Sequence, residues 1–197
     1  MTLRTERKRQ SHEDILRSAA RLVREKGIAG ARVADVMKGA GLTVGGFYAH
    51  FGSKTHLVTE VLRRTAAELR DRLFLRLEEK PPADRVEVIL KRYLSPAHRE
   101  LETEGCPLPA VVGEIGTTAA EYNQVVGEQV EGIADRIHTE LRGSQPIPRR
   151  QLALALVALM YGGLSIARAV RGTALSDEMI KACRALGTFA ARGGGNQ

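Results

Sequence analysis

Residues 42–57, LTVGGFYAHFGSKTHL, concentrate hydrogen-bond donors and contain no acidic residue. Thr43, Tyr48 and His50 offer polar hydrogens, and Lys54 adds a positive charge. Donors and positive charge without a competing carboxylate suit an anionic partner rich in oxygen atoms, such as the phosphate backbone of a nucleic acid. The segment therefore predicts a binding surface.

The same segment contains two adjacent glycines, Gly45 and Gly46, within the pattern of a short helix. Each glycine costs a helix interior about 1 kcal/mol relative to alanine. Phe47 and Phe51 are expected in the core, where packing offsets this cost. We expect Gly45 to let the backbone approach a partner closely, and Gly46 to pack against the preceding helix.

Helical patterns precede and follow this segment. Apolar spacing predicts a first helix over 11–26, capped by Ser11 with Asp14 and ended by Gly27. A second helix over 32–40 and a third over 43–51, capped by Thr43, enclose a short turn with glycine, which is typical of a helix-turn-helix. In that motif the second helix enters the major groove of DNA and the first braces it.

The rest of the chain also predicts helices, so the expected class is all-α with about nine helices. Helices are expected over 53–80, capped by Ser53, and over 83–94, 110–118, 120–142, 148–171 and 176–191. The predicted domains are a basic disordered arm (1–10), a DNA-binding head with the helix-turn-helix (11–52), a larger helical domain (53–191, with 53–80 as the linking helix) and a disordered tail (192–197).

The net charge of +7 is concentrated in the head. Residues 1–56 hold 11 Lys and Arg against 5 Asp and Glu, whereas residues 57–197 hold 19 against 18. A basic segment on a near-neutral body is typical of a nucleic-acid binder. Charge alone also allows a solubilising face. Arg4, Arg7, Lys8 and Arg9 form either an arm that contacts DNA or a solvated tail.

The sequence lacks the features that are typical of secreted proteins, membrane proteins and enzymes. No secretory signal is evident, two cysteines favour a reducing compartment, and the apolar run 152–164 is short for a membrane span. We found no catalytic motif, no metal-ligand spacing and no cofactor loop. The expectation is a cytoplasmic protein that is not an enzyme, without cofactor, metal site or membrane.

Two segments of the chain resemble a known protein family. GLTVGGFYAHFGSKTHLVTEVL resembles the DNA-binding segment of tetracycline-repressor (TetR) family transcriptional regulators, and ILRSAARLVREKGIAGARVADVMKGA resembles its first two helices. The likeness covers about residues 11–65. YLSPAHRELETEGCPLPAVVGEI further resembles an effector-domain segment of one subset of these regulators.

The resemblance implies roles for individual residues. Thr43 caps the recognition helix, Val44 and Gly45 face base edges, Tyr48 and His50 reach phosphate or sugar, and Lys54 holds a phosphate. Two departures are apparent: Ala31-Arg32 replaces the usual Ser or Thr cap, leaving Arg32 as a phosphate contact, and Thr55-His56 replaces a capping-box Glu. The full expected DNA-binding set is Arg32, Thr43, Val44, Gly45, Gly46, Tyr48, Ala49, His50 and Lys54.

A dimer is expected because residues 148–171 are apolar on nearly all sides, which requires burial on all sides. The resemblance implies that the last two helices pair with their copies in a four-helix bundle, with Gly162-Gly163 permitting close approach. A monomer whose own core surrounds this helix is the alternative. The expected interface comprises Leu152, Leu156, Leu159, Met160, Gly163, Met179, Cys183 and Leu186.

The resemblance also implies that the domain 53–191 is an effector-binding and dimerisation domain with a pocket for the effector. Its expected lining is Leu90, Tyr93, Leu94, Cys106, Leu108, Val111, Val112, Ile115, Tyr122 and Val126, although such residues are also ordinary core. Cys106 lies just before a helix, where a thiol pKa is lowered. It is therefore either a sensor of oxidants or electrophiles or a small buried residue, and Cys183 is expected to pack in the core.

These features predict a ligand-responsive, sequence-specific transcriptional regulator, a repressor that binds a near-palindromic operator as a homodimer and is released by a small molecule or electrophile. The partners are double-stranded DNA, an unknown effector and a second copy of the chain. The alternatives are a non-sequence-specific DNA-binding protein and a helical enzyme that processes a small molecule.

Overall fold

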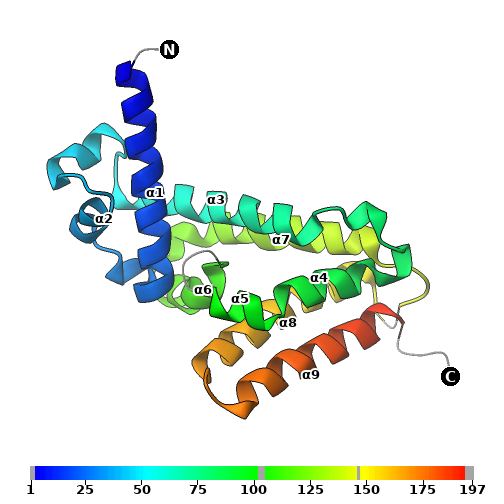
Figure 1. Cartoon of the computed structure of the whole chain (residues 1–197). Helices are drawn as coiled ribbons and strands as arrows, with labels where there is room; N and C mark the ends of the chain where they lie inside the picture. Colours follow the sequence, from blue (N-terminus) through cyan, green and yellow to red (C-terminus); the bar gives the residue numbers. More distant parts are fainter. Residues whose placement is uncertain (1–2, 102–104, 146, 194–197) are drawn as a thin grey trace. The chain divides into compact units, whose positions relative to one another are not determined.

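The computed structural model describes residues 3–101, 105–145 and 147–193, and all regular elements in these ranges are helical. Figure 1 shows their course along the chain. The α-helices are α1 (Leu3–Gly30), α2 (Val33–Gly39), α3 (Lys54–Phe74), α4 (Arg85–Tyr93), α5 (Pro96–Glu100), α6 (Leu108–Thr117), α7 (Asn123–Glu140), α8 (Arg149–Ala169) and α9 (Ala174–Ala191). Short 3₁₀ helices are η1 (Val44–Ala49), η2 (Leu77–Glu79), η3 (Pro82–Asp84) and η4 (Ala120–Tyr122). The predicted all-α class is confirmed.

The chain forms two compact units that do not follow one another in sequence. The first unit comprises Met1–Ala67 and Glu102–Val126, and the second comprises Glu68–Leu101 and Gly127–Gln197. Of the three boundaries, one falls inside α3, one inside α7 and one after α5, between Leu101 and Glu102. The predicted domains 11–52 and 53–191 instead divided the chain once, so they left α6 outside the unit that contains α1 and α2.

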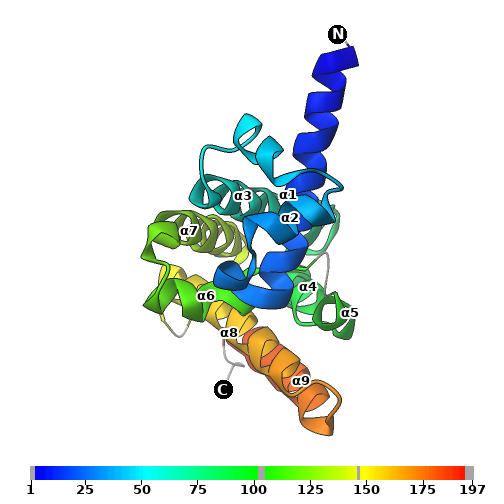
Figure 2. The ribbon, with the colours of Figure 1, turned by 90° about the vertical axis from the view of Figure 1, so that its left-hand side faces the viewer.

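The core of the first unit follows the predicted apolar pattern. Apolar side chains of α1 and α2 are buried together with the two aromatic residues beside the glycine pair: Ile15, Ala19, Leu22, Val23, Val36, Met37, Phe47 and Phe51. Helix α1 contacts both α2 and α6 (Figure 2). Gly39 permits the close approach of α2 to α1, because a Cβ atom there would overlap Oγ of Ser18.

Two predicted boundaries and one helix type in this part of the chain differ from the structure. Helix α1 begins at Leu3, so the described part of the expected arm 1–10 is helical and Ser11 is not a cap. The third helix is the 3₁₀ helix η1 and not an α-helix, consistent with the low helix propensity of Gly45-Gly46. Helix α3 ends at Phe74, before Arg76 adopts a left-handed backbone conformation (φ 49°). Of the predicted tail, residues 194–197 lie outside the described residues.

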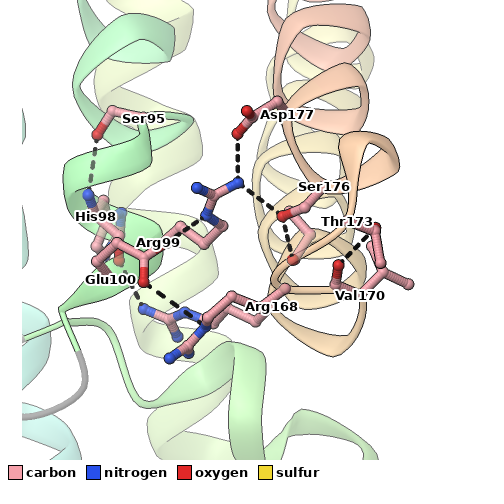
Figure 3. A network of polar contacts seen from close by, with 11 residues as sticks. Ser95, His98, Arg99, Glu100, Arg168, Val170, Thr173, Ser176 and Asp177 are labelled. Carbon is pink, nitrogen blue, oxygen red and sulfur yellow. Dashed lines mark hydrogen bonds and ion pairs between the residues drawn. The ribbon is translucent and has the colours of Figure 1, made fainter.

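In the second unit, α8 packs against α9, and α4 contacts both. A polar network joins α5 to these helices (Figure 3). Arg99 donates to Oγ of Ser176 at 2.7 Å and to Oδ1 of Asp177 at 2.6 Å, and Arg168 donates to the carbonyl oxygen of His98 at 3.0 Å. The network fixes the segment after α4 to the α8–α9 pair.

Helix α8 is long and apolar enough to cross a membrane by length and composition alone. Half of its most apolar window is buried inside the protein, and a core helix of a soluble protein has the same properties. Its length and composition are therefore weak support for a membrane span.

Candidate DNA-binding interface

The segment η1 presents an exposed surface over a buried aromatic pair. Phe47 and Phe51 are buried, whereas Tyr48 is 77% exposed and Val44 is 51% exposed. Thr43, Gly45 and Ala49 are also exposed, and Gly46 is half-buried. No Asp or Glu occurs between Asp35 and Glu60, so the exposed face carries no local negative charge.

The two glycines of η1 have different surroundings. A Cβ atom on Gly45 would meet no atom within 4 Å. A Cβ atom on Gly46 would lie 3.8 Å from Cε of Met37 in α2. Gly46 thus faces the preceding helix, as predicted, whereas Gly45 faces open space.

The predicted weak cap of α2 is confirmed, and the predicted cap by Thr43 is not. Arg32 is the N-cap residue of α2, and its side chain makes no capping hydrogen bond. Thr43 is the N-cap residue of η1 with extended backbone, but its hydroxyl also makes no capping bond. Both side chains are exposed. Neither side chain is therefore used to stabilise its own helix.

Helix α3 begins with a modified capping arrangement. The amide of His56 donates to Oγ of Ser53 at 3.0 Å, which confirms Ser53 as the cap. The amide of Gly52 donates to Nδ1 of His56 at 3.4 Å. His56 thereby accepts a hydrogen bond from the amide of Gly52, one residue before the cap, whereas the Glu of a capping box accepts from the amide of the cap residue itself. The arrangement is therefore not a capping box, in agreement with the sequence.

Lys54 lies at the first position of α3 and is half-buried. Its Nζ donates to the carbonyl oxygen of Ala29 at 3.3 Å. The ammonium group therefore joins the beginning of α3 to the end of α1. It also lies at a helix N-terminus, where the backbone favours anions.

His50 lies in a cluster of rings at the end of η1. The ring of His12 stacks on Phe51 at 4.7 Å between centroids and lies 6.0 Å from the ring of His50. Nδ1 of His50 is buried without a hydrogen-bond partner. Burial lowers the pKa of His50, and the neighbouring His12 and Lys8 lower it further. His50 is therefore a weaker candidate for phosphate binding than Tyr48 or Lys54.

The basic residues before position 10 lie on the exposed first turns of α1. Arg4, Arg7, Lys8 and Arg9 are all exposed. Arg9 forms an ion pair with Glu6 at 2.5 Å. This helical segment therefore presents positive charge on the exposed first turns of α1.

The packing of α8 and α9 changes the set of residues that can form a dimer interface. Leu152, Leu156, Met160, Gly163 and Cys183 are buried within the chain, and Leu159 and Met179 are half-buried. Of the expected interface residues only Leu186 is largely exposed, at 59%. A Cβ atom on Gly163 would lie 2.7 Å from Sγ of Cys183, so this glycine serves the contact of α8 with α9 inside one chain. The five buried residues therefore belong to the core of a single chain and not to the expected dimer interface.

Another set of apolar side chains remains exposed on these two helices. On α8 it includes small residues at helical spacing, and on α9 it includes large ones. The set comprises Leu154, Ala155, Ala158, Gly162, Ile166, Ala169, Leu175, Ala182, Ala185, Leu186 and Phe189. We refer to it as the α8–α9 stripe. Its alignment along both helices is typical of a helix-packing surface.

The expected effector-pocket residues are mostly buried, and they fall in both compact units. In the second unit, Leu90, Tyr93 and Leu94 are fully buried on or directly after α4. A Cβ atom on Gly187 would lie 2.8 Å from Cδ1 of Leu90, and one on Gly163 would lie 3.3 Å from Cδ2 of Leu94. These leucines are therefore closely packed against α9 and α8.

In the first unit, most of the expected pocket residues on α6 and beside it in the chain are buried. Buried residues are Cys106, Leu108, Val111, Ile115 and Tyr122, and Val126 is half-buried. Val112 is 43% exposed. Burial raises the pKa of the Tyr122 phenol and, in the second unit, that of the Cys183 thiol. Neither cysteine forms a disulfide.

One residue with a specific role was not predicted. The carboxylate of Glu114 in α6 accepts hydrogen bonds from the amide of Ile28 at 2.8 Å and from the amide of Ala29 at 2.6 Å. Glu114 is the only acidic residue of α6, between Gly113 and Ile115. That isolated charge in an otherwise apolar helix was the available sequence signal.

Comparison with known proteins agrees with this geometry. The family model of the bacterial regulatory proteins of the tetR family matches residues 15–61, which extend from α1 through η1 into α3. No match was found among curated proteins.

Solved structures match over most of the chain. A TetR transcriptional regulator from Chloroflexus aurantiacus J-10-FL is similar with a TM-score of 0.79 and 23% identity, covering 93% of this chain and 94% of that chain. NemR from E. coli in its reduced form has a TM-score of 0.78 and 21% identity, over 89% and 94% of the two chains. A TetR-family transcriptional regulator from Agrobacterium tumefaciens has a TM-score of 0.76 and 18% identity, over 90% and 97%.

At these identities the solved structures establish the fold, and the match of residues 15–61 establishes the head. Residues 15–61 therefore carry the helix-turn-helix sequence of the tetR family of bacterial regulatory proteins, and the described residues share the fold of solved structures of such regulators.

Proposed function

We propose that this regulator is a cytoplasmic repressor that binds a near-palindromic operator as a homodimer and is released by a small-molecule or electrophile effector. The observation that carries the DNA-binding part is the exposed, acid-free face of η1 above the buried Phe47 and Phe51. Such a face can enter a major groove without electrostatic repulsion from the phosphates.

The proposed DNA contacts divide into two kinds. Val44 and Gly45 lie on the exposed side of η1 and face base edges. Gly46 and Ala49 lie beside them and add no bulky side chain to that surface. Tyr48, Lys54, Thr43 and Arg32 surround it and contact phosphates. Phosphate contacts fix the position of the head, while contacts with base edges give sequence preference. His50 contributes less, because its buried ring favours the neutral form.

The homodimer is supported by the α8–α9 stripe. Exposed apolar surface aligned along two adjacent helices favours burial against a second copy, with Ala158 and Gly162 allowing the helices to approach closely. A twofold dimer presents two heads, so its operator has two half-sites related by the same symmetry.

The effector response is supported by the resemblance of residues 93–115 to an effector-domain segment of ligand-responsive regulators. Cys106 has two possible roles, as a reactive thiol or as a core residue. Its complete burial favours the core role. Ligand release of DNA requires only that effector and operator prefer different conformations of the protein.

Genome-wide footprinting with the purified protein, followed by affinity measurement on the best site and a scrambled version, tests the central proposal. We expect the specific site to bind at least about 10³-fold more tightly at physiological salt. Equal affinity for both sequences would instead support a non-sequence-specific DNA-binding protein. A ligand screen for release from the best site then tests the effector response.

A further inference from the structure

Helix α1 is interrupted at Gly27, three residues before its end. Gly27 has φ 72° and ψ −179°, which breaks the helical hydrogen-bond pattern. The amides of Ile28 and Ala29 therefore stand at the beginning of a new turn, where amides lack partners within the helix. Such amides are satisfied by a side chain, by water or by another acceptor.

Glu114 supplies both acceptors. Its Oε2 accepts from the amide of Ile28 at 2.8 Å, and its Oε1 accepts from the amide of Ala29 at 2.6 Å. Each carboxylate oxygen thus takes one hydrogen bond, and a negative charge lies at the start of the turn, where it is favourable. The arrangement is an N-cap whose capping residue lies more than 80 residues away in the sequence.

A second hydrogen bond joins the same two parts of the first unit. Nε of Arg24 in α1 donates to the carbonyl oxygen of Gly105, three residues before α6, at 2.5 Å. Arg24 and Glu114 thus connect the end of α1 to both ends of the segment containing α6. We call these contacts the α1–α6 clamp.

The capped turn leads directly into the helix-turn-helix. The amide of Ala31 donates to the carbonyl oxygen of Gly27 at 3.2 Å, and Arg32 follows as the N-cap residue of α2. The carbonyl oxygen of Ala29 accepts from Nζ of Lys54 at 3.3 Å. The turn is therefore held by Glu114 through its amides and by Lys54 through a carbonyl group.

We propose that Glu114 is a positioning residue for DNA binding, which caps the turn at residues 27–29 from α6 and so fixes the direction in which the chain enters α2. This inference rests on the proposed function of the head as an operator-binding module. The orientation of the helix-turn-helix then depends on the place of α6, because a shift of about 1 Å that draws the carboxylate away lengthens both bonds beyond hydrogen-bond range.

The space around Gly27 agrees with this role. A Cβ atom on Gly27 would lie 2.7 Å from Oε2 of Glu114, and its positive φ already favours glycine. A side chain at position 27 would thus displace the carboxylate as well as strain the backbone. The sequence requires glycine here for the cap as well as for the turn.

The experiment compares the full-length protein with the variants Glu114→Ala and Glu114→Gln, and with Glu121→Ala as a control. Glu121 is exposed in η4 and has the same charge, so its removal tests the effect of charge alone. Hydrogen exchange of the amides at 28 and 29 reports the cap without any DNA. Affinity for the best footprinted site reports positioning, and thermal unfolding reports general stability.

We expect Glu114→Ala to speed exchange at residues 28 and 29 at least about tenfold and to weaken operator affinity about five- to twentyfold. Glu114→Gln, which keeps one acceptor oxygen, should give an intermediate change in both, and Glu121→Ala should change neither. Exchange in the center of α2 should stay slow in every variant, which separates loss of the cap from unfolding of the head.

Unchanged exchange at residues 28 and 29 in Glu114→Ala would overturn the cap. Faster exchange with unchanged operator affinity, or an equal loss of affinity in Glu121→Ala, would overturn the positioning role. If the wild-type protein shows no preference for any site, the proposed function fails, whereas the exchange measurement still tests the cap separately.

Discussion

The ring of His98 is fixed by Tyr93, five residues earlier in the chain. Nδ1 of His98 donates to the carbonyl oxygen of Tyr93 at 2.7 Å, and the two rings meet edge to face at 4.6 Å between centroids. His98 is buried, and burial, followed by the positive charges of Arg168 and Arg72, lowers its pKa from 6.5 to about 4. The histidine is therefore neutral in the folded protein at neutral pH.

This relationship predicts a stability that falls with acidification. Because the folded pKa of His98 lies below the ordinary value of 6.5, the unfolded chain binds the proton first as the pH drops. The contribution of His98 is complete above pH 6.5 and is lost as the pH falls toward 4. Between pH 7 and pH 5 the loss is about 2 kcal/mol in the free energy of unfolding.

Urea unfolding of the wild type and of His98→Asn at both pH values measures this contribution. Asparagine keeps a donor near the position of Nδ1 but does not titrate, so the variant should lose about 2 kcal/mol less than the wild type on acidification. Equal losses in the two proteins would show that His98 does not contribute to the pH dependence.

Gly45→Leu should leave the fold and dimer intact and abolish operator binding. A Cβ atom at position 45 meets nothing within 4 Å, so the added side chain extends into open space on the face proposed to meet DNA. Circular dichroism, sedimentation and a binding titration measure the three properties. Gly127→Leu in α7, where a Cβ atom also meets nothing within 4 Å, is the matched control and should bind normally. Unchanged affinity in Gly45→Leu would place Gly45 away from the DNA.

Lys54→Met should reduce the salt dependence of operator binding. Each phosphate contact contributes about 0.9 to the slope of log K against log salt, so a dimer that loses two contacts should lose roughly 1.8. The measurement is operator affinity from about 50 to 200 mM salt. Lys38→Met is the control, because Lys38 is exposed near the end of α2 and is outside the proposed contact set. A slope that falls equally in both variants would remove the specific role of Lys54.

Ala158→Glu should convert the dimer to a monomer and weaken operator binding. Ala158 lies in the middle of the α8–α9 stripe, and a buried unpaired carboxylate costs several kcal/mol. Sedimentation over a range of concentrations gives the oligomeric state. The control is Leu75→Glu, which places the same charge at an exposed apolar residue outside α8 and α9. This variant should remain dimeric. A dimeric Ala158→Glu protein would require another interface.

Cys106→Ser should be released from the operator by the same dose of electrophile as the wild type, because the Cys106 side chain is fully buried in the core. Release of the protein from its operator is followed while the electrophile is added to the wild type and the variant. Loss of the response in the serine variant alone would identify Cys106 as the sensor and reverse this expectation.

The helices themselves were predictable because their signals are local. Apolar spacing located the buried face of α1, and the low-propensity residues around Gly41 and Gly52 separated the short elements of the head. The 3₁₀ form of η1 was harder to predict, since Phe47 and Phe51 suit both helix types. In α1, charged residues before Ser11 were expected to be disordered, although they continue the helix as exposed turns.

The part of the candidate site on the exposed face of η1 could be predicted from local sequence. Contacts between residues far apart in the sequence could not. Nothing in the sequence near Gly27 indicates that Glu114 accepts its neighbouring amides. The interface on α8 was also ambiguous, because a helix that is apolar on all sides does not show which side faces its own core. Packing decides this, and it buries Met160 while leaving Ala158 exposed.

The contact between Glu114 and the turn at residues 28 and 29 also affects the order of folding during synthesis. A ribosome makes the whole helix-turn-helix long before it reaches residue 114, so the nascent head lacks the acceptor for two of its amides. Contacts between residues far apart in sequence form late, because closing the intervening loop costs entropy. The turn that leads into the helix-turn-helix thus gains its cap only after residue 114 has been translated.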